Sequence, residues 1–339
     1  RGCLMNVISG YMNHADICQR AQRYYRLKSF IRKNLPLSQG RLTTDDYDRS
    51  LEFLRNQYDV IVVGSDEIWK VEQGPFARPF PNAYWLSESL PCRKIAYAAS
   101  ANKLAYHEVR REHLDLMQRC LRSFELVGVR DHHTFEMIRE WGAVPPDKLE
   151  QVPDPTFFIH IPLDVTKTRQ RLARAGVDFS RKLLGVTFSN RMLNEGIIPY
   201  YKKNGYQVIA MTTYNPSADV NLAGYLNPFE WAQAFQFFSF CYTGLYHGTI
   251  FSLKAGIPFL SLDYFNNPMY ETKIHCLLDD FEMMEYYAAA KGDVIKPAEL
   301  IARAERLICE HDRGKVLEKA NSQQRRAERF LQRMQEVIG

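Results

Sequence analysis

The chain has 339 residues, of which 46% are hydrophobic and 24% charged, and its formal net charge is +5 at pH 7. Its length accommodates two domains of ordinary size, and its composition excludes a disordered or fibrous protein. The small positive charge, without the aromatic pattern of an RNA-binding module, predicts no nucleic-acid partner. It is compatible with an anionic small substrate or a nearby anionic membrane surface.

Cysteine usage and hydropathy indicate the compartment. The seven cysteines are scattered and never form a CxxC pair, which predicts reduced thiols rather than disulfides or a zinc site. We therefore expect no bound metal. No apolar segment approaches the length of a membrane span and no signal peptide is visible, so we expect a cytoplasmic protein. Because the sequence starts at Arg1 without a methionine, we expect residues to be missing before it.

The first predicted helix covers residues 16–34 and stops at Leu35. Apolar and aromatic side chains such as Tyr24 and Ile31 are interleaved with six basic residues: Arg20, Arg23, Arg26, Lys28, Arg32 and Lys33. The favoured interpretation is a packed helix with a solvated basic face. The alternative is a surface that meets anionic lipid headgroups, as a peripheral contact at the inner face of the membrane.

Strands and helices alternate through the first half of the chain. Strands are predicted at 58–63, 93–100, 126–129 and 149–152, and helices at 44–57, 106–123 and 134–142. Such an alternation is typical of a parallel sheet that helices cover on both faces.

Small and polar residues stand where these strands end. Gly64, Ser65, Asp66 and Glu67 follow the first strand, and Ser100 ends the second. Open α/β sheets bind their ligands at this edge, so these residues are site candidates. Ser65 or Asp66 could also cap a helix that follows directly.

Arg130 follows the third strand. A guanidinium in that place can grip a carboxylate or phosphate with two hydrogen bonds. The plainer alternative is a salt bridge from Arg130 to Asp131 or Glu125.

Pro153 and Pro155, followed by the polar run 164–174, predict a linker, and a second alternation begins after it. Strands are predicted at 183–188, 206–210, 235–242 and 259–262, and helices from 227, at 249–254, at 271–279 and through most of 297–338, with a break near Gly314. Asn190 and Arg191 follow the first of these strands. The pattern predicts a second parallel sheet.

The stretch CYTGLYHGTIF, residues 241–251, is the strongest site candidate. Gly244 and Gly248 bracket a strand-to-helix turn, where a backbone without side chains can approach a ligand closely. His247 is expected at the carboxyl end of the strand, beside a helix N-terminus whose N–H groups favour an anion. A histidine that only ties down a loop is the alternative; between two glycines at such a junction, we favour function.

Six segments keep a common order and spacing over about residues 44–280. They are YDVIVVGSDEIW (58–69), KIAYAAS (94–100), GVR (128–130), VPDPTF (152–157), TGLYHGTIFSLKAGIP (243–258) and KIHCLL (273–278). Together they resemble the polysaccharide pyruvyl transferase family.

The resemblance implies an enzyme that transfers a pyruvyl group from phosphoenolpyruvate to hydroxyls of a sugar, forming a cyclic ketal without a further cofactor. The acceptor would belong to a cell-surface polysaccharide, exopolysaccharide or capsule, or to its lipid-linked precursor. The implied fold is α/β, with two Rossmann-like domains facing a cleft, similar to GT-B glycosyltransferases. We expect an acceptor-side domain at 1–160, lacking its first strand–helix unit, a donor-side domain at 175–295, and helices at 296–339 that pack back on the first domain.

The resemblance also implies roles for individual residues. His247 would donate a proton or bind phosphate, and Asp66 or Glu67 would accept a proton from a hydroxyl. The expected substrate-binding residues are Arg130, Gly64, Ser65, Ser100, Asn190, Arg191, Tyr246, Gly248, Thr249 and Lys273. Leu245 stands where the family carries arginine or serine, so we expect another cation near the phosphate, either Arg191 or Lys273.

Two rival functions stay open, because a fold of this kind does not determine its chemistry. One is a GT-B-like glycosyltransferase that uses a sugar nucleotide. The other is a non-catalytic carbohydrate-binding protein. Release of phosphate from phosphoenolpyruvate with a sugar acceptor would separate the three.

Overall fold

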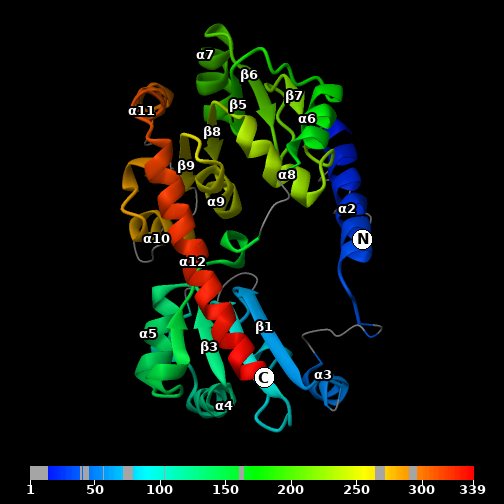
Figure 1. Ribbon diagram of the computed structural model, residues 1–339, viewed down its shortest axis with the longest axis vertical. Coiled ribbons are helices and arrows are strands. Elements are labelled where there is room, and N and C mark those ends of the chain that lie inside the picture. Colours follow the sequence, from blue (N-terminus) through cyan, green and yellow to red (C-terminus); the bar gives the residue numbers. More distant parts are fainter. Residues whose placement is uncertain are drawn as a thin grey trace. The chain divides into compact units, whose positions relative to one another are not determined.

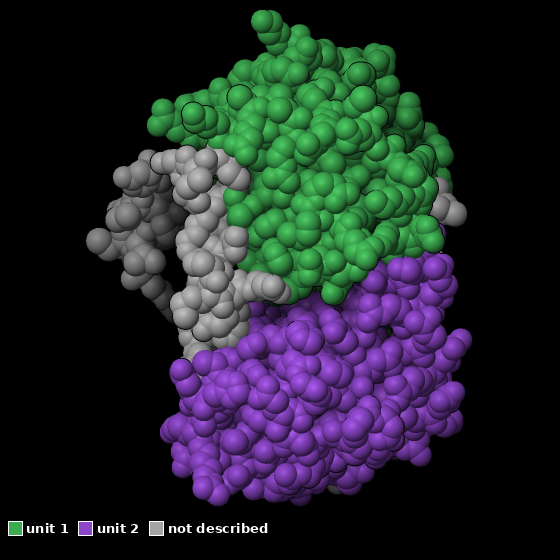
Figure 2. Space-filling model, turned by 90° about the vertical axis from the view of Figure 1, so that its left-hand side faces the viewer, with its two compact units in different colours: residues 1–37, 160–320 green, residues 38–159, 321–339 purple. Residues whose placement is uncertain are grey.

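The computed structural model describes residues 14–38, 40, 46–55, 57–71, 79–102, 104–159, 164–263, 272–289 and 296–339. The chain forms two compact units, one of residues 1–37 and 160–320 and one of residues 38–159 and 321–339 (Figure 2). This division differs from the expected boundaries at both ends of the chain. The expected loss of a first strand–helix unit concerns residues before His14, which lie outside the described residues.

The unit of residues 38–159 and 321–339 is built on a four-stranded parallel sheet in the order β1-β2-β3-β4. Its strands are β1 (Val60–Asp66), β2 (Arg93–Ala99), β3 (Leu126–Val129) and β4 (Leu149–Gln151), and its helices are α3 (Tyr47–Leu54), α4 (Arg111–Arg122), α5 (His132–Trp141) and part of α12 (Arg313–Ile338). Four 3₁₀ turns are described as well: Ala83–Trp85, Tyr106–Glu108, Pro146–Lys148 and Pro155–Phe157. Because the strands are parallel, their carboxyl ends share one edge, which is where the candidate site residues of this unit stand.

The second half of α12 covers one face of this sheet (Figure 1). Phe330 is fully buried there against Ile95 and Leu126. A Cβ on Gly128 would lie 2.6 Å from the Phe330 ring, so a larger residue at this position of β3 would clash with α12. At the helix end, Arg93 donates hydrogen bonds to the carbonyl oxygens of the last two α12 residues, at 2.7 and 2.6 Å. The other face carries a larger core, in which Trp69 and Trp85 stack at 5.4 Å.

The unit of residues 1–37 and 160–320 contains a six-stranded sheet in the order β10-β9-β8-β5-β6-β7, and all its pairings are parallel. The strands are β5 (Leu183–Val186), β6 (Gln207–Ala210), β7 (Val220–Asn221), β8 (Phe240–Thr243), β9 (Phe259–Asp263) and β10 (Tyr287–Ala289). β5, β6, β8 and β9 are buried along their whole length, which is why most of their residues are apolar.

The helices of this unit are α2 (His14–Asn34), α6 (Val165–Arg174), α7 (Ile198–Lys203), α8 (Pro228–Ala234), α9 (Tyr246–Ala255), α10 (Lys273–Asp280), α11 (Pro297–Cys309) and the start of α12. A π-helical turn, Met192–Ile197, leads into α7, and 3₁₀ turns occur at Phe235–Phe237 and Met284–Tyr286. Asn227 and Glu230 form a capping box at the start of α8. No helix in the described residues is long and apolar enough to cross a bilayer.

Side-chain packing explains why the units differ from the expected domains. Gly224 accepts a hydrogen bond from Arg26 at 2.9 Å, and Phe30 stacks edge-on against Phe229 at 5.3 Å, so α2 belongs with residues 160–320 rather than with an N-terminal domain. α11 belongs there too, because the Tyr242 hydroxyl donates to the Leu300 carbonyl within the core. Of the helical segment 296–339, only residues 321–339 belong with residues 38–159.

Three local expectations are corrected. Residues 164–174, expected as a linker, form α6, which Asp164 caps and which buries Thr168 and Leu172. Seven of its ten residues are polar, so the sequence shows no apolar face from which a packed helix could be predicted. The strand β1 continues through Ser65 and Asp66, and no helix follows it directly in the described residues, so neither residue is a helix cap. The expected break near Gly314 lies at residues 310–312, between α11 and α12.

Candidate functional site

In the unit of residues 38–159 and 321–339, the end of β1 is held in a fixed conformation. Asp66, its last residue, has a φ of 81° and accepts a backbone hydrogen bond from Ser100 at 2.9 Å. Gly64 has a φ of 138°, and a Cβ there would lie 1.9 Å from the Tyr97 carbonyl oxygen. Only glycine fits so close to the neighbouring strand. The GSD segment is therefore a tightly constrained strand end that presents the Asp66 side chain.

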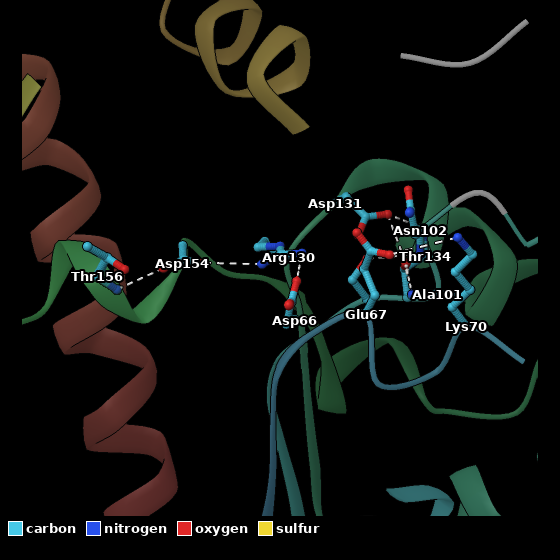
Figure 3. A network of polar contacts seen from close by, with 11 residues as sticks. Asp66, Glu67, Lys70, Ala101, Asn102, Arg130, Asp131, Thr134, Asp154 and Thr156 are labelled. Carbon is cyan, nitrogen blue, oxygen red and sulfur yellow. Dashed lines mark hydrogen bonds and ion pairs between the residues drawn. The ribbon is translucent and has the colours of Figure 1, made fainter. Parts of the chain in front are cut away.

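Arg130 connects Asp66 to a second carboxylate that the sequence analysis did not assign. One terminal nitrogen of the guanidinium donates to Asp66 Oδ1 at 3.0 Å, and the other donates to Asp154 Oδ2 at 3.2 Å (Figure 3). The side chains of Arg130 and Asp154 are 5% and 1% exposed, whereas that of Asp66 is 66% exposed. Asp154 is itself fixed, because its Oδ1 accepts the Thr156 N–H at 2.9 Å. Arg130 thus holds an accessible carboxylate on a buried anchor.

The two acidic residues nearest to Arg130 in the sequence that could pair with it, Asp131 and Glu125, make other contacts. Asp131 caps α5, accepting the Thr134 N–H at 2.8 Å (Figure 3), and Glu125 pairs with Lys148 at 3.4 Å. The positive charge of Arg130 faces two carboxylates instead, so it is already offset before any substrate binds.

The remaining predicted residues of this edge have mixed surroundings. Glu67 forms an ion pair with Lys70 at 4.0 Å. Ser100 is buried and its hydroxyl accepts the Asn102 N–H at 2.9 Å, so it shapes the turn after β2. Ser65 lies within β1 between Gly64 and Asp66.

Tyr97, on β2, is a further polar group beside this network. Burial and the nearby Asp154 carboxylate raise the pKa of the Tyr97 phenol to about 12, so it keeps its proton at neutral pH. Its buried hydroxyl has no hydrogen-bond partner among the described residues. Its ring packs 5.6 Å from that of Phe330.

In the unit of residues 1–37 and 160–320, two threonine hydroxyls fix the turn between β8 and α9. Thr243 Oγ1 lies 3.0 Å from Thr187 Oγ1 at the end of β5, and it accepts the Leu245 N–H at 3.1 Å. Thr187 Oγ1 accepts the Gly244 N–H at 3.1 Å. The ends of two adjacent strands are therefore tied together beneath the helix N-terminus.

Leu245 occupies the N-cap position of α9 and makes no side-chain capping bond. A polar cap would accept first-turn N–H groups and compete with a ligand for them. With leucine there, the positive end of the helix dipole keeps its capacity to favour an anion.

His247 is the second residue of α9 and its side chain is exposed. Its ring lies 5.6 Å from the Tyr246 ring in an edge-on arrangement. Thr249 is buried instead, and its hydroxyl lies 2.8 Å from that of Ser261 on β9. His247 can therefore meet a ligand, while Thr249 braces the helix on the sheet.

Gly248 is required by the packing of this turn. A Cβ there would lie 2.1 Å from Thr243 Oγ1. Replacing Gly248 with alanine is expected to lower the free energy of unfolding by about 1–3 kcal/mol, because the threonine or the helix must shift. Thermal and urea unfolding measure this. Gly314→Ala, in the first turn of α12, is the matched control: a Cβ there meets nothing closer than 3.2 Å, so unchanged or higher stability is expected. Equal losses in both variants would contradict the steric account.

Three further predicted residues come after strands of the same sheet. β5, β8 and β9 are neighbours in the sheet order, so the segments after their carboxyl ends adjoin. Asn190 follows β5 and caps the π-helical turn, accepting the Leu193 N–H at 2.8 Å. Arg191 is 85% exposed and pairs with Glu195 at 2.8 Å. Lys273 is half-buried as the first residue of α10.

Asp263 is a buried carboxylate that the sequence analysis missed, at the carboxyl end of β9. It accepts hydrogen bonds from the hydroxyls of Thr272 and Tyr287, the latter at 3.2 Å. Burial, and then the Asp263 charge, raise the pKa of the Tyr287 phenol. Its place directly after the predicted strand 259–262 was the signal that could have found it. In the described residues, no three His, Cys, Asp or Glu side chains gather as a metal site would require.

Comparisons with known proteins agree with this architecture. A model of the polysaccharide pyruvyl transferase family matches residues 7–267. No curated protein matches the sequence. Among solved structures, the UDP-GlcNAc 2-epimerase from Methanocaldococcus jannaschii superposes with a TM-score of 0.56 at 11% identity, covering 94% of this chain and 97% of that one. An S. aureus MnaA–UDP structure gives a TM-score of 0.54 at 10% identity, covering 92% and 87%. Identities this low bear on the fold alone, and the expected GT-B-like α/β fold with Rossmann-like sheets is confirmed.

Proposed function

Because the chain belongs to the polysaccharide pyruvyl transferase family, we propose that it transfers a pyruvyl group from phosphoenolpyruvate to two hydroxyls of a sugar. The sugar would be part of a cell-surface polysaccharide or its lipid-linked precursor, and the product would be a cyclic ketal. The observation that carries the proposal is the family match over residues 7–267, which includes both strand-end sites described above.

The reaction balances without a further cofactor. C3 of phosphoenolpyruvate gains a proton, which leaves an oxocarbenium-like centre at C2. One sugar hydroxyl adds to C2, the C2–O bond to phosphate breaks, and the second hydroxyl closes the ketal. Of the two protons lost by the hydroxyls, one replaces the proton given to C3 and the other leaves with phosphate. The enzyme must therefore supply an acid, a base and groups that bind two anions.

On the donor side, His247 is the proposed acid. It is exposed at the N-terminus of α9, where the first-turn N–H groups favour the phosphate or carboxylate of the donor. An imidazole ring can both donate and accept a proton, so His247 can give and regain one during turnover. Arg191 comes after β5 and Lys273 after β9, the two strands that flank β8. They are the proposed additional cations in place of the charge that Leu245 lacks.

On the acceptor side, Asp66 is the proposed base. Its carboxylate is accessible, yet its position is fixed by Arg130 and Asp154. A base held in one orientation needs no reorganisation when it takes a hydroxyl proton. In this proposal, Arg130 positions Asp66 rather than binding the donor directly.

The decisive assay measures phosphate release from phosphoenolpyruvate in the presence of lipid-linked glycan acceptors, together with the mass of the glycan product. We expect phosphate and a pyruvylated glycan in equal amounts. Release of a nucleoside diphosphate from a sugar nucleotide, with no use of phosphoenolpyruvate, would instead support the glycosyltransferase alternative. Binding of glycans with neither reaction would support a carbohydrate-binding protein.

A further inference from the structure

Among the described residues of its unit, α2 makes its packing contacts on one face. Gln19, Arg23, Arg26 and Phe30 recur at the spacing of a single helix face and meet the unit there. Arg26 Nε donates to the Gly224 carbonyl oxygen at 2.9 Å. A Cβ on Gly224 would lie 2.4 Å from the backbone of Gln19 and 2.8 Å from that of Arg23, so the helix backbone rests directly on this glycine.

A different face of α2 is apolar and exposed. Seven of the fifteen exposed large apolar side chains in the described residues lie between positions 17 and 37: Ile17, Tyr24, Tyr25, Leu27, Ile31, Leu35 and Leu37. Ile17, Tyr24 and Ile31 are spaced by seven residues, which places them on one strip about a third of a turn from the packing face. Tyr24 is 60% exposed and Ile31 is 40% exposed. The internal packing of the unit does not account for this strip, which we call the α2 strip.

Basic residues outnumber acidic ones beside the α2 strip. Residues 17–38 contain no aspartate or glutamate, although Asp16, in the first turn, pairs with Arg20 at 3.0 Å. Arg20 is 63% exposed, and Arg32 is exposed in the last turn. Lys28 lies 5.6 Å above the Tyr24 ring, so its ammonium sits beside the apolar strip. An apolar strip with tyrosine and flanking cations fits the boundary between acyl chains and anionic headgroups.

We propose that α2 docks on an anionic membrane surface, with the α2 strip in the headgroup boundary and Lys28 and Arg32 on lipid phosphates. Charge complementarity favours this occupant over a second copy of the chain, because two identical basic strips would repel each other. The proposal does not depend on the donor substrate or on the reaction.

The test is co-sedimentation with phosphatidylcholine vesicles, with and without phosphatidylglycerol. We expect binding to the anionic vesicles only, and binding that weakens as salt screens the charges. Each cation near an anionic surface contributes about fivefold to binding, so Lys28→Gln with Arg32→Gln should weaken it by about 25-fold. Tyr24→Ser with Ile31→Ser should weaken it by about tenfold or more through the lost apolar contact.

The matched control is Lys167→Gln with Lys203→Gln, which removes the same charge from exposed positions of the same unit. It should leave vesicle binding within about twofold of the unmodified protein if α2 is the contact, since general charge would act equally from any site. Equal binding to neutral and anionic vesicles, or equal loss in the control pair, would overturn the proposal. So would a dimer in solution that Tyr24→Ser with Ile31→Ser dissociates while vesicles bind nothing. Lys28 is half-buried and the other substituted positions are exposed, and circular dichroism verifies that all variants are folded.

Discussion

Substitution of His247 by alanine is expected to lower the turnover number for phosphate release by about 100-fold or more, the range for loss of a general acid. The side chain is exposed on the first turn of α9, so its removal leaves no buried cavity and the protein should stay folded. Steady-state phosphate release from phosphoenolpyruvate, with a competent acceptor, gives kcat and KM separately. A fall in kcat with little change in KM would indicate a group that acts in the transition state.

Two further variants distinguish proton transfer from simple contact. His247→Gln keeps a hydrogen-bonding side chain but cannot titrate, so it should be as slow as the alanine variant if His247 is an acid. His311→Ala is the control. His311 lies between α11 and α12, and its Nε2 is 2.9 Å from the carbonyl oxygen of Gly256, which caps the carboxyl end of α9. This substitution should change stability slightly and kcat little. Near-normal turnover of folded His247→Ala would leave His247 a structural residue.

Removal of Arg130 is expected to destabilise the protein by about 3–5 kcal/mol, because it leaves the buried Asp154 carboxylate without its ion-pair partner. Urea unfolding of Arg130→Met measures this loss. Adding Asp154→Asn removes the stranded charge, and the amide oxygen can still accept the Thr156 N–H. The double variant should therefore recover much of the lost stability, and the double-mutant cycle gives the coupling energy. Additive losses would show that the pair is not coupled.

Asp66→Asn separates function from stability in the same network. Asp66 is 66% exposed, and exposed ion pairs contribute about 0–1 kcal/mol, so the unfolding free energy should change little. If Asp66 is the acceptor-side base, kcat should fall by about 100-fold or more. Glu67→Gln is the control, since the carboxylate of Glu67 pairs with Lys70.

The sheet strands could be predicted because strands that are buried on both faces consist mainly of apolar residues. The segments 126–129, 206–210 and 259–262 are mostly apolar, with Gln207 and Ser261 as the polar exceptions, and each corresponds to a strand. The strand β7 has only two residues, too few for a pattern to show. The sequence predicts a linker in place of α6, because only Thr168 and Leu172 of the ten residues of this helix are buried.

The candidate site was predictable where it depends on strand ends and not where it depends on long-range pairing. The positions of Asp66, Arg130 and His247 follow from the strands that precede them. The ion pair between Arg130 and Asp154 joins residues on separate loops, and no periodicity in the sequence records it. The membership of α2 was missed for the same reason: its anchor, Gly224, is far away along the chain.

The path of the chain constrains how this protein can be made and cut. The sheet face formed by Ile95, Leu126 and Val152 is covered by residues of α12, which the ribosome delivers long after β4 is complete. During synthesis that face stays exposed to water and to other nascent chains until α12 has been made. Likewise, α2 is made well before Gly224, the residue on which it packs. No single cut therefore yields an intact half, and a fragment of residues 38–159 would carry a bare apolar surface that invites aggregation.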